Sequence, residues 1–122
     1  MTGKILIVDD SALARRNLRQ ILEPAGYEVL EANDGLNALE QYSIDRPDVV
    51  LLDLVMRGMY GLEVLKKLRE LDPEARILVV SADVQTSSQD LVSEAGARGF
   101  VNKPFDPEQI LGAVRAAAEV LG

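Results

Sequence analysis

Residues 5–10 read ILIVDD, a short apolar run that ends on two aspartates, Asp9 and Asp10. Three of the four apolar residues are β-branched, and a run of this length and composition is typical of a buried parallel strand. The pattern recurs in three further runs that precede other reactive side chains: VVLL at 49–52 before Asp53, ILVV at 77–80 before Ser81, and GFVN at 99–102 before Lys103. These four segments predict buried strands, each followed directly by a polar side chain.

Helical patterns separate the predicted strands. Leu13, Leu18, Ile21 and Leu22 recur at helical spacing before Pro24, and Asp106-Pro107 with Gln109 is a strong helix start. The shorter, partly polar run at 27–32 is typical of an edge strand. Five strand–helix repeats predict an α/β fold of the doubly wound, flavodoxin-like (βα)5 type, with a five-stranded parallel sheet in the order 2-1-3-4-5 and helices on both faces.

This topology predicts a site at one edge of the sheet. Open α/β sheets bind ligands beyond the carboxyl ends of their strands, and the first and third strands are neighbours in this order. Asp9, Asp10 and Asp53 are therefore expected to meet there, with Ser81 and Lys103 on the next two strands. Taken singly, each of these residues is more often structural than functional, but their coincidence on one edge favours a site.

Composition narrows the chemistry. The 122 residues are 48% hydrophobic, which is enough to bury the core of one domain spanning 1–122. The chain contains neither Cys nor His, so a bound metal would have only oxygen ligands. The formal charge of −7 argues against binding to a nucleic-acid backbone. With neither a signal-peptide pattern nor a membrane-spanning run, we expect a cytoplasmic protein with no membrane partner.

Clustered carboxylates indicate phosphoryl chemistry. Two carboxylates about 4 Å apart repel by roughly 4 kcal/mol at an effective dielectric constant of 20, so the cluster needs a cation. Lys103 and Mg²⁺ are the candidates, and both would neutralise charge on a transferring phosphoryl group. Asp53 is the candidate nucleophile, because carboxylates form aspartyl phosphates.

The motifs resemble those of the response-regulator receiver family, in particular its single-domain, CheY-like members. The resemblance runs from Lys4 to about Leu121 and rests on four segments: IVDDS at 7–11, LLDLVM at 51–56, VSA at 80–82 and KPF at 103–105. It implies a phosphorylation-activated signalling protein of two-component systems, in which Asp53 accepts a phosphoryl group from a histidine kinase or phosphotransfer protein. Such a domain is no enzyme in its own right, although it assists its own phosphorylation and dephosphorylation.

The resemblance also assigns roles to individual residues. Mg²⁺ would be bound by Asp10, Asp53 and the backbone carbonyl of Val55, with Asp9 helping through water. Lys103 and Ser81 would contact the phosphoryl oxygens, and Phe100 would swing inward as Ser81 moves. The signal would reach a downstream protein through the fourth helix, fifth strand and fifth helix, around Gln89, Val92, Arg98 and Phe105. The Lys103–Pro104 peptide would be cis.

Several positions depart from the family pattern or have another explanation. Arg57 replaces the usual Pro four residues after the acceptor, Tyr60 replaces the frequent Asp or Asn, and Phe100 replaces the frequent Tyr. Arg15, Arg16 and Arg19 could steer a negatively charged phosphodonor, but the simpler expectation is that they form the solvated face of the first helix.

Three alternatives remain open. A phosphatase of the haloacid-dehalogenase type needs a second Asp two residues after the nucleophile, where this chain has Val55. A flavodoxin-type FMN binder wants a Ser/Thr- and Gly-rich phosphate loop, where this chain has two acids. A receiver-like interaction scaffold that is never phosphorylated would not need the acid, hydroxyl and lysine set.

Overall fold

The computed structural model describes residues 3–56, 60–82 and 85–119. Within these ranges, five strands alternate with five helices. Their bounds are β1 Lys4–Val8, α1 Ala12–Leu22, β2 Glu28–Ala32, α2 Gly35–Asp45, β3 Val49–Leu52, α3 Gly61–Leu71, β4 Ile77–Ser81, α4 Thr86–Glu94, β5 Gly99–Asn102 and α5 Pro107–Ala118. The predicted alternation is confirmed, with a second strand one residue shorter than predicted.

The strands form one parallel sheet in the order β2-β1-β3-β4-β5, as predicted. Val8 pairs with Leu52, Leu52 pairs with Val79, and Ser81 pairs with Asn102. This register aligns the carboxyl ends of β1, β3, β4 and β5 along one edge. The segments that follow those strands therefore start side by side.

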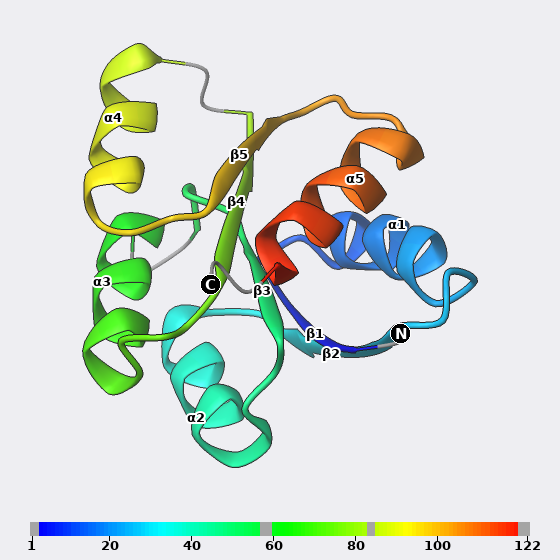
Figure 1. Cartoon of the computed structure of the whole chain (residues 1–122), viewed down its shortest axis with the longest axis horizontal. Coiled ribbons are helices and arrows are strands. Elements are labelled where there is room, and N and C mark those ends of the chain that lie inside the picture. Colours follow the sequence, from blue (N-terminus) through cyan, green and yellow to red (C-terminus); the bar gives the residue numbers. More distant parts are fainter. Residues whose placement is uncertain (1–2, 57–59, 83–84, 120–122) are drawn as a thin grey trace.

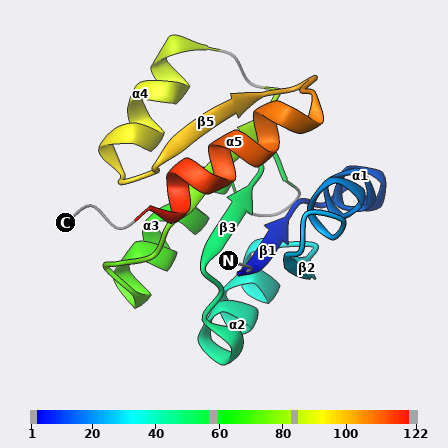
Figure 2. The same cartoon turned by 45° about the vertical axis from the view of Figure 1, so that its right-hand side comes forward.

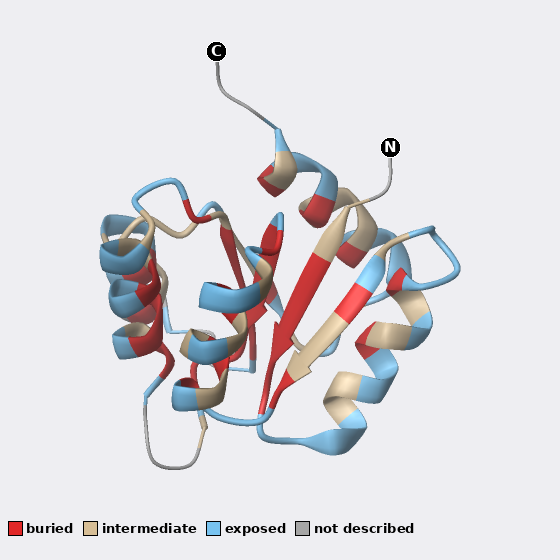
Figure 3. Ribbon diagram, turned by 90° about the horizontal axis from the view of Figure 1, so that it is seen from below, coloured by how far each residue is buried: buried red, intermediate tan, exposed pale blue. Residues whose placement is uncertain are grey.

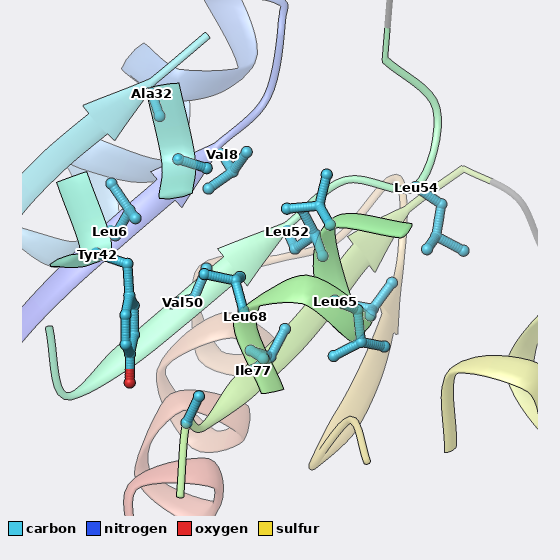
Figure 4. Close-up of a cluster of buried hydrophobic side chains, with 14 of the residues drawn as sticks. Leu6, Val8, Ala32, Tyr42, Val50, Leu52, Leu54, Leu65, Leu68 and Ile77 are labelled. Carbon is cyan, nitrogen blue, oxygen red and sulfur yellow. The ribbon is translucent and has the colours of Figure 1, made fainter. Parts of the chain in front are cut away.

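Helices cover both faces of the sheet, as Figures 1 and 2 show: α1 and α5 lie on one face, and α2, α3 and α4 lie on the other. The central strands are consequently buried from both sides (Figure 3). Ile5, Ile7 and Leu51 pack against α1 and α5, whereas Leu6, Val50 and Leu52 pack against the opposite helices. Figure 4 shows the cluster that contains Leu6, Val50 and Leu52, together with Tyr42 of α2. Burial on both faces explains the uninterrupted apolar runs in the sequence.

Local signals fix the helix starts. The Ser11 and Asp34 side chains accept hydrogen bonds from the backbone N–H groups of Ala14 and Asn37, and so cap α1 and α2. The predicted start of α5 is a complete capping box between Asp106 and Gln109.

The first helix is buried along a narrower stripe than its apolar spacing predicts. The spacing places Leu13 among the apolar residues of this helix, but Leu13 is 66% exposed, because the stripe that faces the sheet runs through Leu18 and Leu22. The peptide between Lys103 and Pro104 is cis, as the family resemblance implied. Leu121 lies outside the described residues.

Candidate functional site

The carboxyl edge of the sheet brings together the residues predicted from sequence. Asp9 and Asp10 follow β1, Asp53 follows β3, Ser81 ends β4, and Lys103 follows β5. One carboxylate oxygen from each aspartate lies within 4.8 Å of those of the other two. The three acids thus form a cluster because β1 and β3 are neighbours, although the sequence separates Asp53 from the other two by more than forty residues.

Asp9 is the most constrained of the three acids. It is 2% exposed, and both of its carboxylate oxygens have partners. Oδ1 accepts a hydrogen bond from the Ser11 backbone N–H at 2.9 Å, and Oδ2 accepts one from Lys103 Nζ at 2.9 Å. The Lys103–Asp9 ion pair therefore joins β5 to β1 across the site, and its burial limits screening by solvent.

Asp53 lies beside this pair. Its carboxylate Oδ2 is 3.6 Å from Lys103 Nζ, and its Oδ1 accepts a hydrogen bond from the Val55 backbone N–H at 3.3 Å. Burial raises the pKa of Asp53 above the usual carboxylic-acid value, as does the charge of Asp9, while Lys103 and hydrogen bonds from Val55 and Ser81 oppose the shift. The Asp53 carboxylate is therefore weakly solvated, and Lys103 is its nearby cation.

Asp10, the third acid, lies on the solvent-exposed side of the site. Asp10 is exposed, as is Val55, whose residue exposure is 61%. The site thus has an inner part, Asp9 and Asp53 with Lys103, and an outer part that faces water. Among the three acids, Asp10 is the one most open to solvent.

The donor set fits a hard divalent cation. Among the described residues, Lys103 pairs with two of the three clustered carboxylates, those of Asp9 and Asp53, and every side-chain ligand that the cluster offers is an oxygen. Such oxygens select Mg²⁺ or a similar ion, which typically takes one or two carboxylates and retains several waters. The side chains in this cluster thus satisfy the chemistry that a Mg²⁺ site requires.

The two residues predicted to transmit a signal lie on β4 and β5. Ser81 is fully buried, and its backbone carbonyl accepts a hydrogen bond from the Lys103 backbone N–H at 2.9 Å. Phe100 is half-buried and packs against the core cluster under α2, α3 and α4. Val92, predicted to be part of a responsive surface, is 2% exposed and belongs to this core, because it is on the inward side of α4.

The arginines of α1 correct another expectation. Arg16 is exposed as expected, but Arg15 and Arg19 both form ion pairs with Glu31 of β2 at 2.8 Å. They are not a solvated face, because β2 is adjacent to α1 and presents a carboxylate to them. The charges of Arg15 and Arg19 are thus paired with an acid of the same domain, and the structure gives no support for the idea that they steer a phosphodonor.

Gly61 is a site-supporting residue that the sequence reasoning did not single out. A Cβ at this position would lie 2.4 Å from the Asp53 carbonyl oxygen and 2.6 Å from the Leu54 Cα. The Gly61 N–H also donates to the Leu54 carbonyl at 2.8 Å. The segment after β3 can approach the start of α3 only because this residue lacks a side chain. Arg57, which departs from the family pattern, lies outside the described residues.

Among the residues that the structure describes, no helix combines the length and the apolar character needed to cross a bilayer.

Comparisons with known proteins match this geometry. A model of the response regulator receiver domain fits residues 5–115. The chain is 38% identical over 120 residues to the chemotaxis protein CheY of Thermotoga maritima, covering 98% of this chain and 100% of that protein. It is 40% identical over 115 residues to CheY of Bacillus subtilis, covering 93% and 96% respectively. A solved CheX–CheY–BeF3–Mg²⁺ complex from Borrelia burgdorferi has a TM-score of 0.92 at 31% identity and covers 96% of this chain and 90% of that one.

Proposed function

The chain belongs to the response regulator receiver family of two-component signalling, and from this premise we propose that Asp53 accepts the phosphoryl group. A receiver domain is a regulatory phosphoacceptor rather than a catalytic enzyme. The observation that supports Asp53 most directly is its position. It is largely buried beside Lys103 and two further carboxylates, of which Asp10 is exposed to solvent.

The proposed reaction is a phosphoryl transfer to a carboxylate. An oxygen of Asp53 forms a bond to the phosphorus of a phosphohistidine, and the phosphorus–nitrogen bond breaks. The electron pair of that bond stays on the donor imidazole, which takes up a proton from solvent. The product is an aspartyl phosphate, and attack by water returns Asp53 and releases inorganic phosphate.

The residues around Asp53 would assist both steps. Lys103 Nζ, 3.6 Å from the Asp53 carboxylate, is placed to neutralise charge on the transferred group. Asp9, Asp10, Asp53 and the Val55 backbone carbonyl are the proposed holders of Mg²⁺, Asp9 through water. When bound, Mg²⁺ supplies positive charge to the phosphoryl oxygens and offsets the repulsion among the acids.

The proposed partners are a donor and a target. The donor is a histidine kinase or phosphotransfer protein, and a groove of about 410 Å³ beside Lys103, between α1 and the segment 104–107, offers space for part of it. The target is a protein that binds the surface formed by α4, β5 and α5, which includes Gln89, Arg98 and Phe105. Ser81 and Phe100 are the proposed link between Asp53 and that surface. A domain extent of 1–122 and a cytoplasmic location stay predictions.

Intact-mass measurement tests the proposal. After incubation with acetyl phosphate and Mg²⁺, the wild type should gain the mass of one phosphoryl group, whereas Asp53→Asn should gain none and keep its circular dichroism spectrum. Chelation of Mg²⁺ should abolish the gain. Modification of Asp53→Asn to the same extent as the wild type would assign the acceptor to another residue.

A further inference from the structure

We propose that Arg15 is a positioning residue that fixes the metal-ligand loop, residues 9–11, between β1 and α1. This role deepens the proposed function and rests on it, because it concerns the Mg²⁺ ligands Asp9 and Asp10. Arg15 would act through the backbone of Asp9 and would touch neither the metal nor the phosphoryl group.

Two hydrogen bonds hold the Arg15 guanidinium in place. Nη1 donates to the Asp9 backbone carbonyl at 2.7 Å, and Nε donates to Glu31 Oε1 at 2.8 Å. The Arg15 side chain is only 17% exposed. A guanidinium suits this task because its donors diverge from one rigid plane, so that fixing one of them restricts the direction of the other.

Glu31 anchors this arrangement to the sheet. It belongs to β2, and its second oxygen accepts a hydrogen bond from Arg19 Nε at 2.8 Å. Partial burial raises the pKa of Glu31, but the hydrogen bonds from Arg19 and Arg15 outweigh burial and hold the pKa below its usual value. Glu31 therefore stays ionised at neutral pH and connects Arg15 to an element outside the loop.

The Arg15 bond completes the fixation of Asp9. The Asp9 N–H donates to the Ala32 carbonyl at 3.2 Å, and its carboxylate oxygens are held by Ser11 and Lys103. The carbonyl bond to Arg15 is the fourth contact. With it, each hydrogen-bonding group of Asp9 has a partner.

Fixing the Asp9 carbonyl also orients the next residue. The peptide bond is planar, so the carbonyl oxygen of Asp9 and the nitrogen and Cα of Asp10 lie in one plane. Asp10 is exposed, whereas Asp9 is buried. The Asp10 backbone starts from this plane, so the Arg15 contact with the Asp9 carbonyl helps to set where the Asp10 side chain begins.

The structure offers a matched control for this role. Arg19 bonds to the other oxygen of Glu31 and also to Glu23 and the Val29 carbonyl, and none of these partners is in the loop. Arg19→Met removes two ion pairs, to Glu31 and Glu23, whereas Arg15→Met removes one, to Glu31, so the control disturbs the ion-pair network at least as much. Only Arg15→Met removes a contact to Asp9.

The experiment is a Mg²⁺ titration of the full chain, followed by the Asp10 backbone amide in ¹H–¹⁵N NMR spectra. Arg15→Met should raise the half-saturating Mg²⁺ concentration about tenfold, the lower end of the usual effect of outer-shell partners on metal affinity. Arg19→Met should leave it within about twofold. With acetyl phosphate as donor, the Arg15→Met phosphorylation rate should return close to the wild-type maximum at saturating Mg²⁺, because the reacting groups are intact.

Arg15→Lys keeps the charge without the diverging donors and provides a second variant should Arg15→Met unfold. Its half-saturating concentration should also rise, though less than for Met. If Arg15→Lys and the wild type had equal half-saturating Mg²⁺ concentrations, the effect would come from charge alone and the positioning role would be overturned. An equal increase of this concentration in Arg15→Met and Arg19→Met would also overturn it. A wild type that does not respond to Mg²⁺ would overturn the proposed metal site and this role together. Response in the wild type with Arg15→Met unchanged would overturn this role alone.

Discussion

The Asp53→Asn variant should be more stable than the wild type without Mg²⁺ and less stable than the wild type when Mg²⁺ is bound. The substitution keeps the shape of the side chain and removes one of three clustered charges. In the metal-free protein the variant should be more stable, because an ionised, largely buried carboxylate is removed. With Mg²⁺ the wild type should be more stable, because it retains the Asp53 carboxylate as a metal ligand.

The distances between the Asp53 carboxylate and the neighbouring charges set the expected stability difference in the metal-free protein. At an effective dielectric constant of 20, the 3.6 Å separation from Lys103 Nζ corresponds to an attraction of about 4.6 kcal/mol. Repulsion from a second carboxylate oxygen within 4.8 Å is at least about 3.5 kcal/mol at the same dielectric constant. Asp10 is exposed and so contributes only about 1 kcal/mol more. Attraction and repulsion nearly cancel, so the desolvation of Asp53 decides the sign, and we expect a gain of about 1 kcal/mol for the metal-free variant.

The metal adds a larger effect in the opposite direction. A ligand at one hundred times its dissociation constant stabilises the folded state by about 2.7 kcal/mol if the unfolded chain does not bind it. The variant should gain less than half of this. The difference between the two proteins should therefore change sign between chelator and saturating Mg²⁺.

Urea unfolding followed by circular dichroism measures both free energies of unfolding. The pKa of Asp53 is raised in the folded state, so the folded protein binds its proton more tightly than the unfolded chain does. The metal-free wild type should accordingly approach the variant in stability as the pH falls through the raised pKa. Glu74→Gln, an exposed acid in the loop before β4, is the control and should show no such crossing. A metal-free Asp53→Asn that is less stable than wild type at neutral pH would refute the reasoning.

Three further predictions concern stability and signal transfer. Gly61→Ala should lower the free energy of unfolding by about 3 kcal/mol, since the new Cβ would lie 2.4 Å from a backbone oxygen. Gly112 of α5 has open space around it, so Gly112→Ala should raise the free energy of unfolding by about 0.5 kcal/mol in the same urea experiment. Tyr42→Phe removes the 2.7 Å hydrogen bond that lowers the pKa of Asp72, so it should cost about 1 kcal/mol at neutral pH. The cost should disappear as the pH falls through the lowered pKa of Asp72, and a pH-independent cost would show that packing alone is responsible. Ser81→Ala should still be phosphorylated, but beryllofluoride should shift the NMR amide signals of 98–105 less than in the wild type, and equal shifts would exclude the hydroxyl as the link.

An amino-acid sequence indicates which residues are apolar but not what lies beside each polar residue. Leu13 fits the helical spacing of α1 and is nevertheless exposed, since a helix of this length has more apolar positions than its buried stripe requires. Arg15 and Arg19 look like solvated residues until β2 brings Glu31 to within 2.8 Å. Gly61 carries no local signal beyond its identity, and its necessity comes from backbone contacts to 53 and 54.

The alternation of strands and helices, the order of the sheet and the edge at which the site residues meet can all be predicted from the chain without its structure. These features follow from apolar runs and capping residues, which are local in the chain, and from the right-handed crossover that restricts how such units connect. Which acid is buried, how Lys103 lies between Asp9 and Asp53, and the contact of Arg15 with the Asp9 carbonyl become known only from the folded chain. Those outcomes depend on distances of a few ångströms between segments far apart in sequence, and electrostatic energies at such distances depend strongly on burial, which no single segment specifies.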